Sequence, residues 1–169
     1  VNNFQGNQVS TAEWIDTDSS PHHVLLLTAY SFAAGDLMTI ILKDGGKIHW
    51  SWCCRWEEEP PEQEPIIALI RNLTAWRKGA GRDYLHFGRM EKPLALNGVG
   101  EYAFKRKKGS RLSYPSVLTT RWSLPERPDA QFLVNYLPEE QTVTVATEPG
   151  TVVTVHRAAD GSVTERIEG

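Results

Sequence analysis

The segment SVLTTRWSLPERPDAQFLVNYL, residues 116–137, decides the fold of this chain. Both halves are rich in Val, Thr, Leu and aromatic residues, which favours strands, and the turn-forming stretch LPERPD separates them. Similar short runs follow, QTVTVAT, GTVVTVHRA and SVTERIE, with EPG and ADG between them. Several short strands at this spacing predict an antiparallel β-sandwich in residues 91–169.

The N-terminal half contains helix signals instead. Ser20 and Pro21 give an N-cap residue followed by proline at the first helical position. The run HHVLLLTAYSFAAG then ends at Gly35, a residue type that is common just after a helix. Because this run is apolar on nearly every side, the helix is predicted to be buried all round.

A second helix is predicted to begin at Pro65 and to weaken or end at Gly79 or Gly81. Its apolar residues recur at helical spacing, and they are Ile66, Ile70, Leu73 and Trp76. Arg71 and Arg77 lie off this stripe. The predicted fold class is therefore α+β, with a mixed helix and strand segment in residues 1–90, a sandwich after it, and a boundary near Glu91–Leu94.

Between the two helices, LMTIILK and KIHWSWC flank an Asp-Gly turn and predict a β-hairpin. The second strand alternates in polarity, with Ile48, Trp50, Trp52, Cys54 and Trp56 on one face and Lys47, His49, Ser51, Cys53 and Arg55 on the other. The indoles either fill the core of a half-buried strand or form a platform that stacks on a sugar ring. The candidate sugar contacts are Trp56, which is nearest the following loop, and Trp52, Trp50 and His49.

The same stretch does not predict a metal or catalytic centre. Cys53 and Cys54 point to opposite faces of a strand, and His49 shares a face with Cys53 only, which does not suit zinc. The acidic loop EEEPPEQEP is proline-rich and would position a carboxylate pair for glycoside hydrolysis badly. We therefore expect no metal ion and no cofactor, and we assign no catalytic residue.

Composition excludes further classes. A net charge of −3 leaves no basic excess for a nucleic acid partner. No apolar run approaches the roughly 20 residues of a membrane span, so no membrane partner is expected. The chain begins at Val1 without a signal-peptide pattern, and its adjacent cysteines, predicted to be free thiols, favour a reducing compartment such as the cytoplasm.

The succession of RKGAGRDYLHFGRMEKP, residues 77–93, and the antiparallel module resembles the tail of TIM-barrel glycoside hydrolases of the α-galactosidase-like and related uncharacterised kinds. The residues that match the family pattern are Arg82, Tyr84, Leu85, Phe87, Gly88, Arg89, Val117, Leu118, Trp122, Phe132, Leu133, Val134, Asn135, Glu139, Gln141, Val143 and Val145. The sequence departs from that pattern at LPERPDAQ, where an Asp-Gly turn is usual, so the turn geometry there is left open.

The resemblance implies that residues 1–90 are the last part of a glycosidase barrel, in which residues 20–60 are the end of the barrel sheet and its flanking helices. A full barrel takes about 250 residues, so the chain is expected to be the non-catalytic C-terminal portion of a larger carbohydrate-active enzyme and to be inactive alone. Its partners would be carbohydrate, and either the remainder of that polypeptide or a second copy through self-association. Two alternatives stay open, a stand-alone carbohydrate-binding β-sandwich module and a structural or interaction protein without enzymatic activity.

Two local predictions concern polar side chains. Asp83, Tyr84, His86 and Arg89 follow the second helix and are expected to form a polar joint between it and the sandwich. Asn135 is expected to bond backbone groups in the turn after its strand, because asparagine side chains commonly do so.

Overall fold

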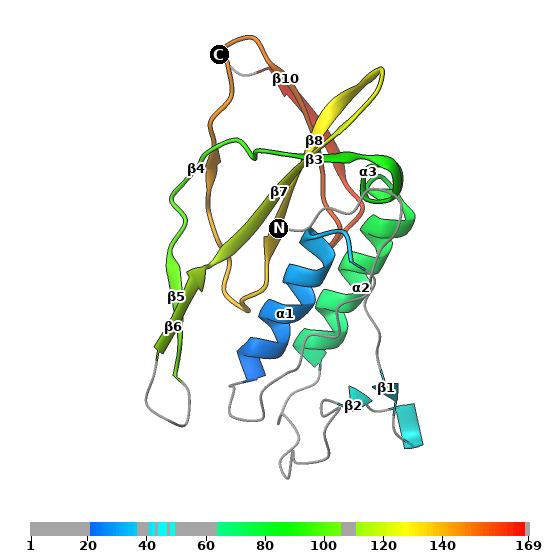
Figure 1. Ribbon diagram of the computed structural model, residues 1–169, viewed down its shortest axis with the longest axis vertical. Helices are drawn as coiled ribbons and strands as arrows, with labels where there is room; N and C mark the ends of the chain where they lie inside the picture. The colour runs from blue at the N-terminus through cyan, green and yellow to red at the C-terminus, as the bar shows by residue number, and fades with distance from the viewer. Residues whose placement is uncertain are drawn as a thin grey trace.

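The computed structural model describes residues 21–36, 41–42, 44–46, 48–49, 64–105 and 111–167 (Figure 1). The helices are α1 (Pro21–Ala33), η1 (Asp44–Gly46), α2 (Glu64–Lys78) and α3 (Arg82–Phe87). The strands are β1 (Ile41–Leu42), β2 (Ile48–His49), β3 (Arg89–Glu91), β4 (Leu96–Asn97), β5 (Glu101–Lys105), β6 (Arg111–Pro115), β7 (Val117–Leu124), β8 (Arg127–Asn135), β9 (Thr144–Val145), β10 (Val152–His156) and β11 (Val163–Ile167).

The strands form small antiparallel sheets. The central sheet has the order β3-β7-β8, and the pairs β1-β2, β4-β9, β5-β6 and β10-β11 each form a two-stranded sheet. The prediction of an α+β chain is thereby confirmed as a mixture of helices with several small antiparallel sheets.

The β7–β8 hairpin is the predicted pair of strands, and its turn resolves the point that the sequence left open. Leu124 pairs with Arg127, so only two residues connect the strands. The second of them, Glu126, has a φ of 61°, in the left-handed region that glycine usually occupies. A register shift between Trp122 and Leu124 precedes the turn. The hairpin therefore reverses without a glycine, through the positive φ of Glu126.

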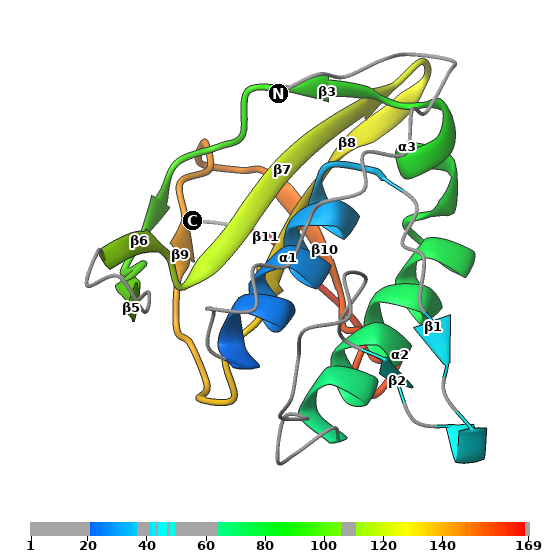
Figure 2. The same ribbon diagram turned by 60° about the horizontal axis from the view of Figure 1, so that its bottom comes forward.

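One hydrophobic core joins the helices to the central sheet. Its buried members are Leu25, Leu26, Ala29, Phe32, Ile66, Leu73, Leu85, Trp122, Phe132, Val134 and Tyr136. In Figure 2, α1 runs alongside β7 and β8, and α2 lies beside α1. The described core thus extends across the predicted boundary near Glu91–Leu94, where the chain changes from helix to strand.

Helix α1 has the predicted ends but not the predicted burial. Asp36 N donates to Ser31 O and Gly35 N donates to Phe32 O, the paired bonds of a glycine-terminated helix. Leu26 and Ala29 are buried, yet Tyr30 is 45% exposed. The prediction of burial all round is wrong, because the described neighbours of α1 are α2 and the central sheet and they leave Tyr30 uncovered.

Arg77 has a role that its position off the apolar stripe did not indicate. Its Nη2 donates to Asp36 O at 2.6 Å, and its guanidinium lies 5.7 Å from the centre of the Phe32 ring. Burial lowers the pKa of Arg77, while the charge of Asp36 acts in the opposite direction. Because Asp36 follows α1 and Arg77 is in the last turn of α2, this contact brings the C-terminal ends of two parallel helices together.

The predicted hairpin between these helices is present where the structure describes it. Ile41 pairs with His49 and Leu42 with Ile48, antiparallel, around η1. Residues 50–63 lie outside the described residues, and so do the candidate sugar contacts Trp50, Trp52 and Trp56.

We expect Gly35→Ala to destabilise the protein by about 1–3 kcal/mol more than Gly150→Ala. Both glycines have a φ of 81°, so both variants incur the same backbone strain. A Cβ at Gly35 would lie 2.9 Å from Cη2 of the buried Trp122, whereas a Cβ at Gly150 would meet no atom within 4 Å. Urea unfolding monitored by circular dichroism measures the difference, and equal losses would show that Trp122 does not restrict this helix end.

Candidate functional site: a polar joint between helix α3 and the central sheet

The sugar-binding hypothesis rests on residues that the structure describes only in part. Of the four candidates, Trp50, Trp52 and Trp56 lie outside the described residues. The fourth, His49, is in β2 and pairs with Ile41 through the backbone, and its side chain is outside the described part. The hypothesis therefore stays a prediction, and the described residues offer a different candidate.

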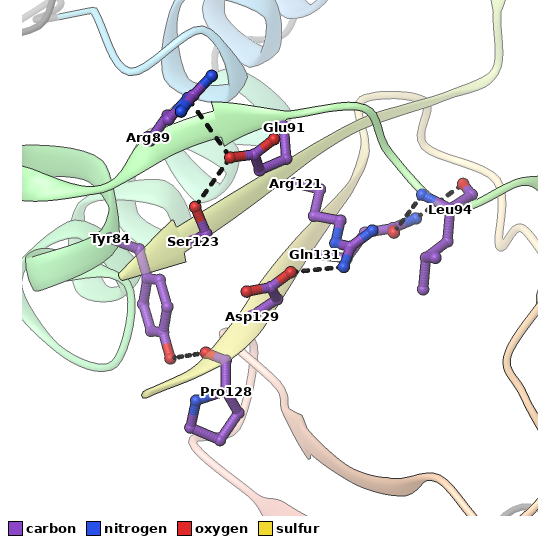
Figure 3. A network of polar contacts seen from close by, with 9 residues as sticks. All are labelled: Tyr84, Arg89, Glu91, Leu94, Arg121, Ser123, Pro128, Asp129 and Gln131. Atoms are coloured by element: carbon purple, nitrogen blue, oxygen red, sulfur yellow. Dashed lines mark hydrogen bonds and ion pairs between the residues drawn. The ribbon is translucent and has the colours of Figure 1, made fainter. Parts of the chain in front are cut away.

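The outward face of the central sheet holds a set of polar side chains, here called the polar sheet face (Figure 3). Its members are Arg89, Glu91, Arg121, Ser123, Asp129 and Gln131. The register Glu91↔Arg121 and Arg121↔Gln131 puts residues of all three strands side by side on this face. Strand alternation directs the intervening residues, such as Trp122, to the core.

Two groups of charged contacts connect neighbouring strands of this face. Ser123 Oγ donates to Glu91 Oε1 at 3.1 Å, and Arg89 Nε lies 3.5 Å from the same oxygen. Arg121 Nη2 donates to Asp129 Oδ2 at 2.5 Å. The first group links β3 to β7 and the second links β7 to β8. Because these side chains are partly exposed, each ion pair contributes at most about 1 kcal/mol.

The side chain of Gln131 holds the segment that follows β3 against the central sheet. Leu94 N donates to Gln131 Oε1 at 2.8 Å, and Gln131 Nε2 donates to Leu94 O at 3.2 Å. An amide that both donates and accepts can satisfy both backbone groups of one residue. This contact holds the segment after the predicted boundary against the sheet, and no motif in the sequence indicated it.

Helix α3 is tied to the turn end of the β7–β8 hairpin. Tyr84 Oη donates to Pro128 O at 2.6 Å, and Arg127 Nη1 donates to Asp83 Oδ2 at 2.7 Å. The expectation of a polar joint after the second helix is confirmed for Asp83 and Tyr84.

Gly88 allows the chain to pass closely over α3 as it enters β3. Gly88 N donates to Tyr84 O at 2.9 Å, and a Cβ on Gly88 would lie 2.3 Å from that same oxygen. Any side chain at this position would therefore require the backbone to move. This contact explains why a glycine stands at position 88, between Phe87 and Arg89.

The end of β8 is stabilised by Asn135 as predicted. Asn135 Nδ2 donates to Glu139 O at 2.8 Å, and Leu137 N donates to Asn135 Oδ1 at 2.9 Å. Next to it, Tyr136 is 1% exposed and its Oη donates to Pro115 O at 2.8 Å. Burial raises the pKa of Tyr136 to about 12, and Tyr102 and Tyr114 act in the same direction. No feature of the sequence indicated this role of Tyr136.

The chemistry of this region suits structural support. The carboxylates of Glu91 and Asp129 are each engaged by an arginine, and Glu91 also accepts from a hydroxyl. Within the described ranges, no three His, Cys, Asp or Glu side chains gather in a way that would hold a metal ion. These contacts hold the three strands in register and hold α3 against the β7–β8 hairpin.

The described helices include none with the length and apolar content needed to cross a membrane. Comparison with protein-family models, with curated proteins and with solved structures found no match to the chain.

Proposed function

We propose that the chain is the C-terminal, non-catalytic portion of a glycoside hydrolase-like, carbohydrate-active enzyme. Residues 1–90 would be the last part of a TIM barrel, and residues 91–169 a β-sandwich that packs against the barrel's final helices. The catalytic carboxylates would lie in another part of the polypeptide, so this chain alone would be inactive.

The observation that most favours this proposal is the parallel arrangement of α1 and α2. Figures 1 and 2 draw the two helices side by side, and the Arg77–Asp36 contact joins their C-terminal ends. In a TIM barrel each strand is followed by a helix, and neighbouring helices in the outer ring run in the same direction. Two consecutive helices can be parallel neighbours only if the chain between them returns along their length. The described part of that connection is the antiparallel β1–β2 hairpin.

The residues behind the family resemblance support the same proposal. Leu85 and Trp122 are both core residues, and Gly88 permits the close passage from α3 into β3. Asn135 closes the turn after β8. The resembling positions therefore include the structural joint between the helices and the sheet, which is what the tail of such an enzyme requires.

The sugar contacts in this proposal are Trp56, Trp52, Trp50 and His49. They follow or belong to β2 and precede α2 in the chain. In a TIM barrel the segments between a strand and the next helix form the active-site face. Indoles in such a segment would stack on a sugar that is cleaved by carboxylates from elsewhere.

The test compares this chain with the native polypeptide to which it belongs. Purified residues 1–169 are expected to give no turnover on a panel of aryl-glycosides, whereas the native polypeptide, extended by a barrel-sized segment of roughly 250 residues, is expected to hydrolyse at least one. Turnover by residues 1–169 alone would contradict the proposal. So would a native polypeptide whose additional residues lack alternating strands and helices.

In the active polypeptide, Trp56→Ala is expected to raise KM about tenfold or more with a smaller change in kcat, because the lost stacking affects substrate binding. The control is Trp76→Phe, whose ring lies 4.9 Å from Phe132 in the core. That variant should lower the melting temperature and leave KM unchanged. An unchanged KM in Trp56→Ala would remove Trp56 from the sugar site without affecting the proposed architecture.

A further inference from the structure

In the part of the chain that the structure describes, the C-terminal hairpin has a strand edge without a partner strand. β10 pairs with β11 over five consecutive residue pairs without a register shift, from Val152↔Ile167 to His156↔Val163. Among the described residues, no strand pairs with the second edge of β10. Val152 and Val163, on the same face of the hairpin, are each 58% exposed. A regular, apolar strand with a free edge is a template for pairing with another strand.

The composition of β10 lacks the features that usually prevent such pairing. Its five residues, VVTVH, contain no Lys, Glu, Asp, Arg or Pro, and four of them are β-branched. Edge strands in monomeric proteins are commonly protected by charges, prolines or bulges. β11 differs, because its sequence VTERI places Glu165 and Arg166 in the middle of the strand.

The free edges of β10 and β11 also differ in which side chains would face one another if each strand paired with its own copy. An antiparallel pair of β10 strands related by a two-fold axis at Thr154 would place Val153 opposite Val155 and Thr154 opposite Thr154 of the second copy. β-Branched cross-strand pairs of this kind are favourable. The same operation on β11 would place Glu165 opposite Glu165, and like charges in that position are destabilising. Charge therefore selects β10 for pairing and excludes β11.

We propose that two copies of this chain associate through antiparallel pairing of their β10 strands, forming a continuous sheet with the order β11-β10-β10-β11. The occupant of the free edge is a second copy because β10 is matched to itself in length, charge and side-chain shape. This inference concerns a surface on the C-terminal hairpin and does not depend on the proposed enzymatic context.

The test uses a charge at the two-fold position. Residues 1–169 are expected to be dimeric in sedimentation experiments between about 1 and 100 μM, with a Kd in the micromolar range. Thr154→Lys and Thr154→Glu each place like charges opposite one another in the dimer, and each is expected to raise the Kd at least about tenfold. Mixing the two variants in equal amounts should restore association, because lysine then faces glutamate.

Thr164→Lys is the matched control, since Thr164 is also an exposed threonine of the hairpin but belongs to β11. It is expected to dimerise like the wild type. The proposal is overturned if the wild type is a monomer throughout the concentration range, if Thr154→Lys associates normally, or if the mixed variants remain monomeric. Equal weakening by Thr164→Lys would also overturn it, because the contact would then not be specific to β10.

Discussion

Phe132→Ala is expected to lower the free energy of unfolding by about 3–5 kcal/mol, a large share of the roughly 5–15 kcal/mol that stabilises a typical domain. Phe132 is 2% exposed and lies edge-on to two rings from different helices. Its ring centre is 6.0 Å from that of Phe32 in α1 and 4.9 Å from that of Trp76 in α2. The substitution removes a ring that contacts both helices from the sheet and leaves a cavity that the packed surroundings fill only in part.

The measurement is urea unfolding followed by far-ultraviolet circular dichroism and by tryptophan fluorescence. Leu133→Ala is the control, because Leu133 is the next residue in β8 but is 43% exposed, and its loss should be below about 1 kcal/mol. With one shared core, both signals should report a single transition that moves together in Phe132→Ala. Two separate transitions, of which only one moves, would contradict the shared core and would favour independent domains at residues 1–90 and 91–169.

Alkaline pH is expected to destabilise the protein through Tyr136. Burial raises the pKa of Tyr136 to about 12 in the folded state, from an ordinary value of 10.0. Above about pH 10 the phenol ionises in the unfolded chain but not in the folded one, so the stabilising contribution of the neutral, buried Tyr136 is complete below pH 10 and is lost as pH rises towards 12. A difference of about two pH units between the folded and unfolded pKa corresponds to roughly 3 kcal/mol.

Tyr136→Phe separates this effect from simple loss of packing. At about pH 9 the variant is expected to be less stable than the wild type by roughly 0.5–1.5 kcal/mol, because Pro115 O loses the hydrogen bond from Tyr136 Oη. Near pH 12 the order should reverse, because only the wild type contains the phenol whose ionisation opposes folding. Urea midpoints measured across this pH range give the comparison.

Tyr30→Phe is the control for the alkaline experiment, because it removes the hydroxyl of a tyrosine that is 45% exposed. It is expected to show no reversal. A Tyr136→Phe variant whose stability stays parallel to that of the wild type from pH 9 to 12 would show that the buried phenol does not control alkaline unfolding.

Several local elements of this protein could be predicted from its sequence. Pro21 and Gly35 set the limits of α1, and the spacing of Ile66 and Leu73 indicated α2. The turn residues LPERPD separated the two long strands of the central sheet. These features depend on contacts between residues close together in the chain, and residue type alone is enough to indicate them.

The candidate site was predictable only in part. Asn135 was identified because its partners are in the adjoining turn. Asp83 and Tyr84 were identified because polar residues cluster after the second helix, but the sequence did not indicate their partners Arg127 and Pro128, which are 44 positions away. The bond of Gln131 to Leu94 and that of Tyr136 to Pro115 were not predicted at all, because the partners are 37 and 21 positions apart and no motif or polar cluster marks either residue. The proposed sugar-binding role of residues 49–56 remains a prediction, because residues 50–56 lie outside the described residues.

The sequence by itself determined α1, α2, the β1–β2 hairpin and the strands from β7 onward, because periodicity, capping residues and turn residues act over a few positions. It did not indicate α3 or the strands β3 to β6. Only the tertiary structure decided that α1 is parallel to α2, that Phe132 lies between them and that one core spans the change from helix to strand. The physical reason is that apolar side chains bury wherever complementary surfaces meet, and a sequence pattern states which face is apolar without stating which partner covers it.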